Sequence, residues 1–421
     1  MIDVKIIRQN PELIKKACRD KGFFDLEKRI DEFIKLDKEK REILTQIEKI
    51  NAQKNKASRI IKEKGKEKKL IEELRALDKT YENLKKKLNE KGEALKEILF
   101  LIPNIPLDDV PVGKDEKDNV VIREVGERPR FDFVPKDHLE LGEKLNLIDV
   151  KRAAKVSGTR FGYLKNEAVL IEFALIQLAF ENLLGEGFIP ILPPVMIKPE
   201  ILRGMGYIEQ LDKEEAYYLE KDKLYLVGTA EHSIGPYFAN EILREKDLPR
   251  RFIGFSTCFR REAGSWGKDT RGIFRVHQFD KIEMFSFCHP EKSKTEHEYF
   301  LSLEEKLMKV LEIPYRVVKI CTRDLGRPAA AKYDIEAWIP SQNRYRETHS
   351  TSNCTDFQTR RLNIRYQDRS GKLKFPHTVN GTVFAIGRTL IAILENYQTK
   401  DGSVKIPKAL QKYLPFKEIK R

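Results

Sequence analysis

The stretch FRREAGSWGKDTRGIFRVHQFDKIE, residues 259–283, is the part of the chain that decides its fold. Apolar runs flank it at 251–256 and 284–287, which predicts two strands joined by a long loop. Arg260 and Glu262 are two residues apart, so on a strand they point the same way. A guanidinium suits phosphate and a carboxylate suits an amino group. A salt-bridged hairpin without a ligand is the alternative that this stretch leaves open.

Length and composition indicate a globular chain with room for two or three domains. It has 421 residues, of which 35% are charged and 40% hydrophobic. No apolar run approaches the roughly 20 residues of a membrane helix, and the first residues do not look like a signal peptide. We therefore expect a cytoplasmic protein without membrane contact. The five cysteines form no C-x-x-C pair, which argues against zinc or a disulfide framework.

Residues 26–101 are predicted to form one long antiparallel helical hairpin, a coiled coil with its turn near Gly65. The stretch has no proline, and Gly65 and Gly92 are its helix breakers. Apolar residues recur at heptad spacing in both halves, with Lys91 in one polar position. They are Phe33, Leu36, Ile43, Ile47, Ile50, Ala57 and Ile61, then Leu70, Leu74, Leu77, Tyr81, Leu84, Leu88, Leu95 and Ile98. Each arm should run roughly 50 Å.

The expected tip of this hairpin is basic. Eight Lys or Arg and two Glu lie between Lys54 and Lys69, in a chain whose net charge is +14. Such a surface favours contact with a nucleic-acid backbone, and a rigid basic rod suits duplex RNA, which is recognised by shape. Aromatic residues are missing near the tip, so stacking on single-stranded bases is not expected. A solvated coiled-coil surface is the alternative.

Beyond the hairpin the sequence changes to an α+β pattern. Residues 1–102 should form the N-terminal domain, the proline-rich residues 103–130 a linker, and residues 131–421 a second domain. The chain has no G-x-G-x-x-G or P-loop motif. Strand-like segments predict a mainly antiparallel sheet with helices on one face. They cover residues 224–227, 252–255, 281–287, 315–320 and 333–339.

Four further segments carry small, polar or basic residues beside apolar runs. The stretch GFIPILPPVM, from Gly187 to Met196, is a proline-interrupted strand that suits a sheet edge or an interface. VGTAEH at 227–232 ends in an acid, and RETHSTSNCTDFQTRR at 346–361 is rich in hydroxyl groups. In VNGTVFAIGRTLIAILENYQ, at 379–398, a strand gives way to a helix at Arg388. A helix N-terminus already favours an anion.

Taken in order behind the helical hairpin, these segments closely resemble the seryl-tRNA synthetase family of class II aminoacyl-tRNA synthetases, in its bacterial form. The stretches beginning at Gly187, Phe259 and Gly387 are similar to class II motifs 1, 2 and 3. Residues 229–231 (TAE) and the block ending in SNCTDFQTRR are more specific to the seryl family. The resemblance implies a class II antiparallel sheet flanked by helices. It also implies that the helical arm binds tRNA(Ser).

The implied reaction has two steps. The carboxylate of L-serine attacks the α-phosphate of ATP, and a terminal ribose hydroxyl of tRNA then attacks the seryl-adenylate. Serylation of tRNA(Sec) as well would depend on the host. Neither step needs a protein nucleophile, so catalysis should rest on positioning and on balancing phosphate charge. Mg²⁺ is the implied cofactor, with Glu347 as a plausible ligand.

The resemblance also assigns residues to each substrate. Arg260, Arg275 and Arg388 are the expected catalytic residues, with Arg260 at the α-phosphate and the other two at the outer phosphates. The expected ATP-binding set is Arg260, Arg261, Glu262, Arg275, Val276, Phe279, Glu347, Thr348, His349, Ser350 and Arg388. Within it Glu262 lies near the adenine amino group and Phe279 stacks on adenine. The expected serine-binding set is Thr229, Ala230, Glu231, Glu283 and Thr382.

Two features depart from these assignments. His349 stands where the family has a small hydroxyl residue, so it either turns away from the nucleotide or hydrogen-bonds a phosphate or the ribose. Arg261 and Arg271 have no single ligand and could belong to the packing of the loop or to the tRNA acceptor end.

Motif 1 serves the dimer interface throughout the class, so the resemblance implies a homodimer through the stretch from Gly187 to Met196. Two other functions remain open for the same fold. One is loading of an amino acid onto a carrier protein, although such relatives lack the long arm. The other is RNA binding without catalysis, which the presence of Arg260, Glu262, Arg275, Glu283 and Arg388 disfavours.

Overall fold

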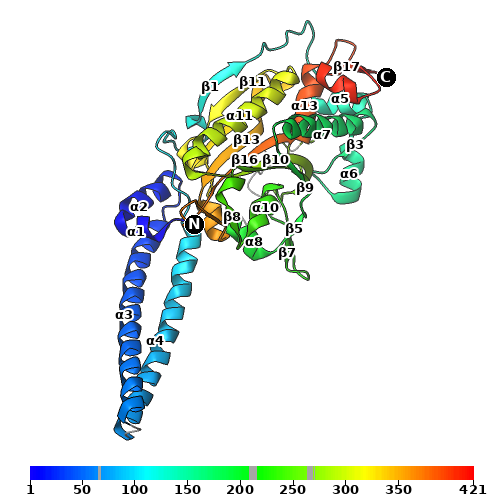
Figure 1. Cartoon of the computed structure of the whole chain (residues 1–421). Helices are drawn as coiled ribbons and strands as arrows, with labels where there is room; N and C mark the ends of the chain where they lie inside the picture. Colours follow the sequence, from blue (N-terminus) through cyan, green and yellow to red (C-terminus); the bar gives the residue numbers. More distant parts are fainter. Residues whose placement is uncertain (65–67, 208–215, 263–268, 270) are drawn as a thin grey trace. The chain divides into compact units, whose positions relative to one another are not determined.

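The computed structural model divides the chain into two units, Met1–Pro103 and Asn104–Arg421 (Figure 1). It describes all residues except 65–67, 208–215, 263–268 and 270.

The first unit is helical. Two short helices, α1 (Val4–Gln9) and α2 (Pro11–Asp20), precede the long α3 (Leu26–Lys64) and α4 (Lys68–Leu101), which lie side by side in Figure 1. The predicted helical hairpin is therefore confirmed, while its predicted turn at Gly65 lies outside the described residues. The seam is buried where α3 begins and α4 ends, at Ile30, Phe33, Leu95 and Ile98.

The polar position in the heptad seam has a partner on the facing helix. Lys91 of α4 forms an ion pair with Glu39 of α3, and both side chains are half-buried. Further along, the Lys54 ammonium lies 2.5 Å from the Asp78 carboxylate and 4.9 Å from the centre of the Tyr81 ring. A polar group inside a coiled-coil seam sets which positions face each other. These pairs hold α3 and α4 in one register.

The second unit is built on a mainly antiparallel sheet. In the described part of the chain it has eight strands in the order β1-β11-β12-β13-β16-β10-β9-β4, and only β4 runs parallel to its neighbour. The strands are β1 (Val120–Val125), β4 (Ile189–Ile191), β9 (Arg250–Phe259), β10 (Gln278–Cys288), β11 (Tyr315–Lys319), β12 (Ala331–Ile339), β13 (Arg344–Thr355) and β16 (His377–Ala385). The predicted strand–loop–strand at 259–283 is β9, its loop and β10.

One element of the predicted linker needs correction. Residues 120–125 form β1, which pairs antiparallel with β11 and is the edge strand of the large sheet. This part of 103–130 therefore belongs to the second unit. The sequence VVIREV lacks the alternation of a half-buried strand, and five of its six side chains are exposed, which is why no strand was predicted there.

Three long helices cover one face of this sheet: α7 (Glu167–Gly185), α11 (Ser293–Val310) and α13 (Ile386–Asn396). Their inner residues and the strand residues beneath them form the main hydrophobic core. The opposite face carries a smaller core under α8 (Pro199–Met205), α10 (Glu231–Ile234) and α12 (Phe357–Arg361). Helices thus lie on both faces, although only one face was predicted to carry them. The second face also carries the cavity described below.

Short elements complete the unit. The helices are α5 (His138–Lys144) and α6 (Val150–Ser157). The strands are β2 (Ile148–Asp149), β3 (Tyr163–Leu164), β5 (Met196–Ile197), β6 (Tyr218–Leu219), β7 (Leu224–Leu226), β8 (Ile242–Arg244), β14 (Arg365–Gln367), β15 (Leu373–Lys374), β17 (Val404–Lys405) and β18 (Glu418–Ile419). The segment predicted as a strand at 224–227 is β7, which pairs with β5 and β6 in a small sheet of its own.

Helix α7 is the one helix in the described part of the chain long and apolar enough to cross a membrane by length and composition. The core helix of a globular protein passes the same test. One side of α7, including Ile171, Leu175 and Leu178, is buried in the main core. The other side exposes Leu170 and Phe173.

The proline-interrupted strand was predicted to suit a sheet edge or an interface, and the structure places it at an edge. β4 is the last strand of the large sheet, and Pro190 lies opposite Ile253 of β9. Proline cannot donate to a second neighbour, so it is tolerated at this position.

Candidate active site

A cavity of about 660 Å³ opens on the second face of the sheet. Its walls come from β9, β10, β13 and β16, from the loop before α10 and from the first turn of α13. Segments that are far apart in the sequence therefore meet there. The cavity has a buried end lined by acids and hydroxyl groups, and a second part lined by arginines and aromatic rings.

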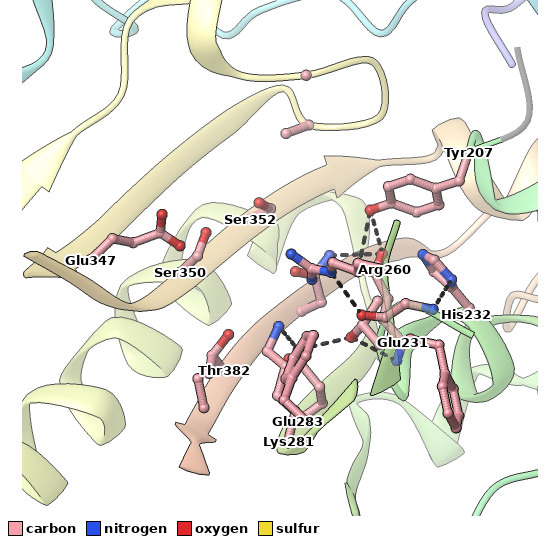
Figure 2. A pocket seen from close by; sticks show the side chains of 18 of the residues that line it. Tyr207, Glu231, His232, Arg260, Lys281, Glu283, Glu347, Ser350, Ser352 and Thr382 are labelled. Carbon is pink, nitrogen blue, oxygen red and sulfur yellow. Dashed lines mark hydrogen bonds and ion pairs between the residues drawn. The ribbon is translucent and has the colours of Figure 1, made fainter. Parts of the chain in front are cut away.

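At the buried end, Glu231 is held by three donors. Its carboxylate accepts a hydrogen bond from the Tyr207 hydroxyl at 3.2 Å (Figure 2). It also accepts hydrogen bonds from the Gln358 amide at 2.9 Å and the Asn380 amide at 3.2 Å. Gln358 is oriented in turn by the Thr378 hydroxyl, which donates to its amide oxygen at 2.7 Å. The carboxylate thus has a fixed orientation at the end of the cavity.

The pKa of Glu231 is raised to about 7, first because burial disfavours its charged form and also because the Glu283 carboxylate is near. The hydrogen bond from Gln358 and the charge of Lys281 act in the opposite direction. Glu231 is 5% exposed. An acid that is half protonated near neutrality binds a cationic group most strongly once it has lost its proton.

Glu283 faces Glu231 across the cavity and has two partners of its own. The Thr229 hydroxyl donates to its carboxylate at 2.9 Å, and the Lys281 ammonium forms an ion pair with it (Figure 2). Thr382 is paired with Glu283 across β10 and β16, so its hydroxyl enters the same end of the cavity. Thr229, Glu231, Glu283 and Thr382 are brought together as predicted.

Ala230 is placed differently from the other residues of this set. Its side chain is fully buried in the smaller core with Ile234 and Phe285. It follows Thr229 where the chain enters α10, whose first residue is Glu231. Its small size lets that turn pack against the sheet. Its side chain therefore supports the site from beneath.

The other part of the cavity begins at Arg260, directly after β9. The Arg260 guanidinium donates to the carbonyl oxygen of Gly228 at 3.1 Å, and its central carbon lies 5.3 Å from the Phe279 ring centre. The backbone N–H of Arg260 donates to the carbonyl oxygen of His277 at 2.9 Å, and the His277 ring donates through Nδ1 to the carbonyl oxygen of Arg260 at 3.0 Å. These contacts hold together the two ends of the loop between β9 and β10. Val276 and Phe279 line the cavity beside them.

Two predicted residues of the loop pair with each other. The Arg275 guanidinium lies 2.5 Å from the Glu262 carboxylate, and both residues line the cavity. Arg261 extends elsewhere: it donates to the carbonyl oxygen of Ala216 at 3.2 Å and lies over the Tyr217 ring. Its side chain therefore contacts a neighbouring segment, whereas Arg260 and Glu262 contribute to the cavity wall.

Arg388 and Glu347 meet at the rim. Arg388, the third residue of α13, donates to the carbonyl oxygen of Glu347 at 3.0 Å and lies 3.3 Å from its carboxylate. Partial loss of hydration at the rim would raise the pKa of Glu347, but the charges of Arg388, Lys332 and Arg260 outweigh this effect and hold that pKa well below its usual value. Glu347 is therefore ionised at neutral pH, and its side chain is 47% exposed.

A β-bulge in β13 decides which residues of the 347–350 block reach the cavity. Glu347 pairs with Glu336 and His349 with Ile335, so Thr348 is an extra residue on this strand. Glu347, Thr348 and Ser350 line the cavity. His349 points to the other face, where it is 1% exposed and its ring centre lies 5.8 Å from that of Phe384.

The assignment of His349 to ATP is therefore corrected by the structure, which supports the alternative that this side chain turns away. Its Nδ1 lies 2.8 Å from the Thr348 hydroxyl. Burial lowers its pKa to about 4, so it is a neutral ring in the core at physiological pH.

Several cavity residues were not singled out from the sequence. Lys281 and Asn380 each lie two positions before a predicted residue on the same strand, Glu283 and Thr382. The two-residue period of a strand could have identified both. Tyr207 and His232 come from other segments, and no local pattern distinguishes them. The pKa of His232 is lowered to about 3 by burial and by Arg260, so it is neutral.

Comparison with known proteins agrees with this arrangement. Residues 1–106 match the family model of the seryl-tRNA synthetase N-terminal domain. Residues 216–397 match that of the tRNA synthetase class II core domain (G, H, P, S and T).

Individual relatives match over the whole length. The chain is 47% identical to a serine–tRNA ligase of Dictyoglomus turgidum, over 100% of this chain and 99% of the relative. Among solved structures, a seryl-tRNA synthetase from Pyrococcus horikoshii complexed with ATP is 44% identical, with a TM-score of 0.95 and coverage of 100% and 99%. A cytoplasmic serine–tRNA ligase from Naegleria fowleri in complex with AMP is 33% identical, with a TM-score of 0.89 and the same coverage. The chain belongs to the seryl-tRNA synthetase family of class II aminoacyl-tRNA synthetases.

Proposed function

We propose that the cavity activates L-serine with ATP and transfers it to tRNA, the reaction of a serine–tRNA ligase. The observation that carries this proposal is that a buried acid and hydroxyl cluster and an arginine-lined surface share one cavity in a member of this family. An amino acid and a nucleotide could therefore react inside it.

The buried end is suited to serine. Glu231 would bind the ammonium group, because its carboxylate is buried and already oriented by three donors. Thr229, Glu283 and Thr382 would surround the small hydroxyl group. Alanine lacks that hydroxyl, so binding it would leave buried polar groups unpaired. Threonine would have to be excluded by size, which is a weaker basis for discrimination.

The arginine-lined part is suited to ATP. Phe279 would stack on adenine, Glu262 would accept from its amino group, and Arg260 would bridge the α-phosphate and the serine carboxylate. Arg275 and Arg388 would bind the outer phosphates, exchanging Glu262 and Glu347 for phosphate oxygens. Serine would then be aligned for attack on the α-phosphate while charge on the phosphates is balanced.

Glu347 fits the role of a Mg²⁺ ligand. It is an ionised carboxylate at the rim beside Ser350, and Mg²⁺ in nucleotide sites commonly uses one or two carboxylates together with phosphates. Among the described residues no group of three potential ligands is arranged to hold a metal by itself. Bound Mg²⁺ would supply further positive charge at the phosphates.

The first unit is proposed to bind tRNA. Residues 1–102 would form the tRNA-binding domain and residues 131–421 the catalytic domain. The basic residues between Lys54 and Lys69 would contact the phosphate backbone of tRNA(Ser), and of tRNA(Sec) in a host that has it. A cytoplasmic location is part of the proposal.

A homodimer through the stretch from Gly187 to Met196 is supported by exposed apolar side chains. Leu192 is 79% exposed and Met196 is 49% exposed, and Phe173 of α7 is 59% exposed. Large apolar side chains exposed on neighbouring elements are typical of an interaction surface.

The proposal is tested by serine-dependent exchange of pyrophosphate into ATP with the purified chain. We expect exchange with serine, and far less with alanine, glycine or threonine. Exchange with alanine or glycine in place of serine would favour a carrier-protein loader. If no amino acid supports exchange, the result would favour a non-catalytic RNA-binding protein.

A further inference from the structure

Lys281 is a partly buried cation at the buried end of the cavity, and although it lies within the stretch similar to motif 2, none of the roles proposed above uses it. It lies on β10 two residues before Glu283, so both side chains point to the same face of the sheet. Its side chain is 13% exposed and forms an ion pair with the Glu283 carboxylate, which is 3% exposed (Figure 2).

The surroundings explain why a cation is needed at this position. Glu231 and Glu283 both line this end of the cavity, and the charge of Glu283 disfavours ionisation of Glu231. Glu231 is oriented by neutral donors from Tyr207, Gln358 and Asn380, whereas Glu283 is held by Thr229 and by the charged Lys281. The two carboxylates therefore differ: one has neutral partners and the other is already neutralised.

This difference matters for the ligand. Serine has one ammonium group and one neutral hydroxyl group, so it needs one carboxylate that is free to bind a cation and one acceptor that is not. With two unneutralised carboxylates, the pocket would favour a ligand that carries two ammonium groups, because each buried charge would then be paired.

We propose that Lys281 is a specificity-determining residue, which neutralises Glu283 so that this side of the pocket accepts a hydroxyl group and rejects an ammonium group on the amino-acid side chain. The inference rests on the proposed function, because it assigns this end of the cavity to serine. Lys281 acts through Glu283 and leaves the substrate ammonium to Glu231.

The test compares serine with 2,3-diaminopropionate, which has nearly the same size and carries an amino group in place of the hydroxyl. The ratio of kcat/KM for the two substrates is measured by pyrophosphate exchange with the full chain. In Lys281→Met we expect the ratio to shift toward 2,3-diaminopropionate by roughly ten- to a hundredfold, the range over which one contact discriminates substrates. Lys281→Arg should keep the original ratio.

Two further variants separate specificity from a structural effect. Lys319→Met is the matched control. Lys319 lies on β11 and forms an ion pair with Asp109, so this variant should leave the ratio unchanged. Lys281→Met combined with Glu283→Gln should lose the preference for 2,3-diaminopropionate, because no unpaired carboxylate is left. This is a double-mutant cycle.

Three results would overturn the inference. One is an unchanged ratio in Lys281→Met. Another is a loss of ATP affinity in that variant without a change in ratio, which would place Lys281 at the phosphates. The third is a preference that persists in the double variant. If Lys281→Met does not fold, the double variant Lys281→Arg with Glu283→Gln is compared with Glu283→Gln alone. Relative to the unaltered chain, the double variant must change the ratio of kcat/KM values no more than Glu283→Gln alone does. Failure of the proposed function is distinct, because the unaltered chain would then show no serine-dependent exchange.

Discussion

At the scale of single residues, the buried end of the cavity depends on how charge is distributed between its acids. Glu231 is oriented by a tyrosine and two amides, while Glu283 is neutralised by Lys281 and bonded by Thr229. Burial makes each of these interactions stronger than it would be in water, and it also makes a missing partner costly. Substitutions here should therefore alter specificity and pH dependence as well as rate.

The affinity for serine should rise with pH between about 6 and 8. The pKa of Glu231 is raised to about 7, so the acid is mostly protonated below that value and mostly ionised above it. Only the ionised form attracts the ammonium group of serine. We expect KM for serine in pyrophosphate exchange to fall roughly tenfold from pH 6 to pH 8.

Glu231→Gln provides the control for this dependence. It should raise KM for serine at pH 8 and remove most of the change between pH 6 and pH 8. A pH profile of KM that is the same in Glu231→Gln as in the unaltered chain would show that another group is responsible.

Arg388→Ala should abolish activation while leaving the fold intact. The guanidinium lies at the start of α13 beside Glu347, where an outer phosphate would lie in the proposed complex. Loss of one charge-stabilising donor typically lowers kcat by about 10²- to 10³-fold. Pyrophosphate exchange measures the loss, and circular dichroism checks the fold. Arg244→Ala, which removes an exposed arginine paired with Asp247 at the end of β8, should keep near-normal exchange.

At the scale of elements, two features of the strands and helices control the site. The bulge at Thr348 directs Glu347 and Ser350 to the cavity and His349 to the core. The heptad seam holds α3 and α4 together. Periodicity predicted the seam, because a heptad is a local pattern. The family resemblance assigned His349 to ATP together with its neighbours, but one inserted residue in β13 shifts the face of those beyond it.

Shortening the arm should separate the two steps of the reaction. The ion pair between Glu39 and Lys91 shows that α3 and α4 are side by side at these residues. Residues 40–90 can therefore be replaced by a short Gly/Ser linker with the base of the arm retained. We expect serine-dependent pyrophosphate exchange to stay near normal, while tRNA charging falls by at least tenfold as phosphate contacts are lost.

A milder variant tests the basic tip itself. Replacing Lys56, Arg59, Lys62 and Lys69 by Gln should weaken tRNA binding and reduce its dependence on salt concentration. Equal losses of exchange and of charging in the shortened chain would contradict a role of the arm in reading tRNA.

At the scale of the whole molecule, the second unit leaves apolar side chains uncovered on α7 and after β4. Phe173, Leu192 and Met196 are exposed, although their neighbours form the main core. Burial of this surface against a second copy would explain why a helix this apolar keeps one side exposed.

Leu192→Asp should convert the proposed dimer to a monomer. A carboxylate buried without a partner costs several kcal/mol, so we expect the dissociation constant to rise by about 100-fold. Light scattering after size-exclusion chromatography gives the mass as a function of concentration. Val112→Asp is the matched control, because Val112 is also exposed, at 70%, but precedes Gly113, which packs against Cys321 beyond the end of β11. If the unaltered chain is a monomer at micromolar concentration, the proposed interface is wrong.

The sequence by itself predicted the helical arm, the strand–loop–strand at 259–283, an edge or interface position for β4 and, through the family resemblance, most residues of the candidate site. These follow from heptad spacing, from alternation along strands, from proline chemistry and from motifs that lie within a few residues of one another. Only the tertiary structure decided that residues 120–125 extend the sheet and that His349 faces the core. It alone brought Tyr207, Gln358 and Asn380 to the Glu231 carboxylate. Such contacts depend on register and packing between distant segments, and no local pattern records them.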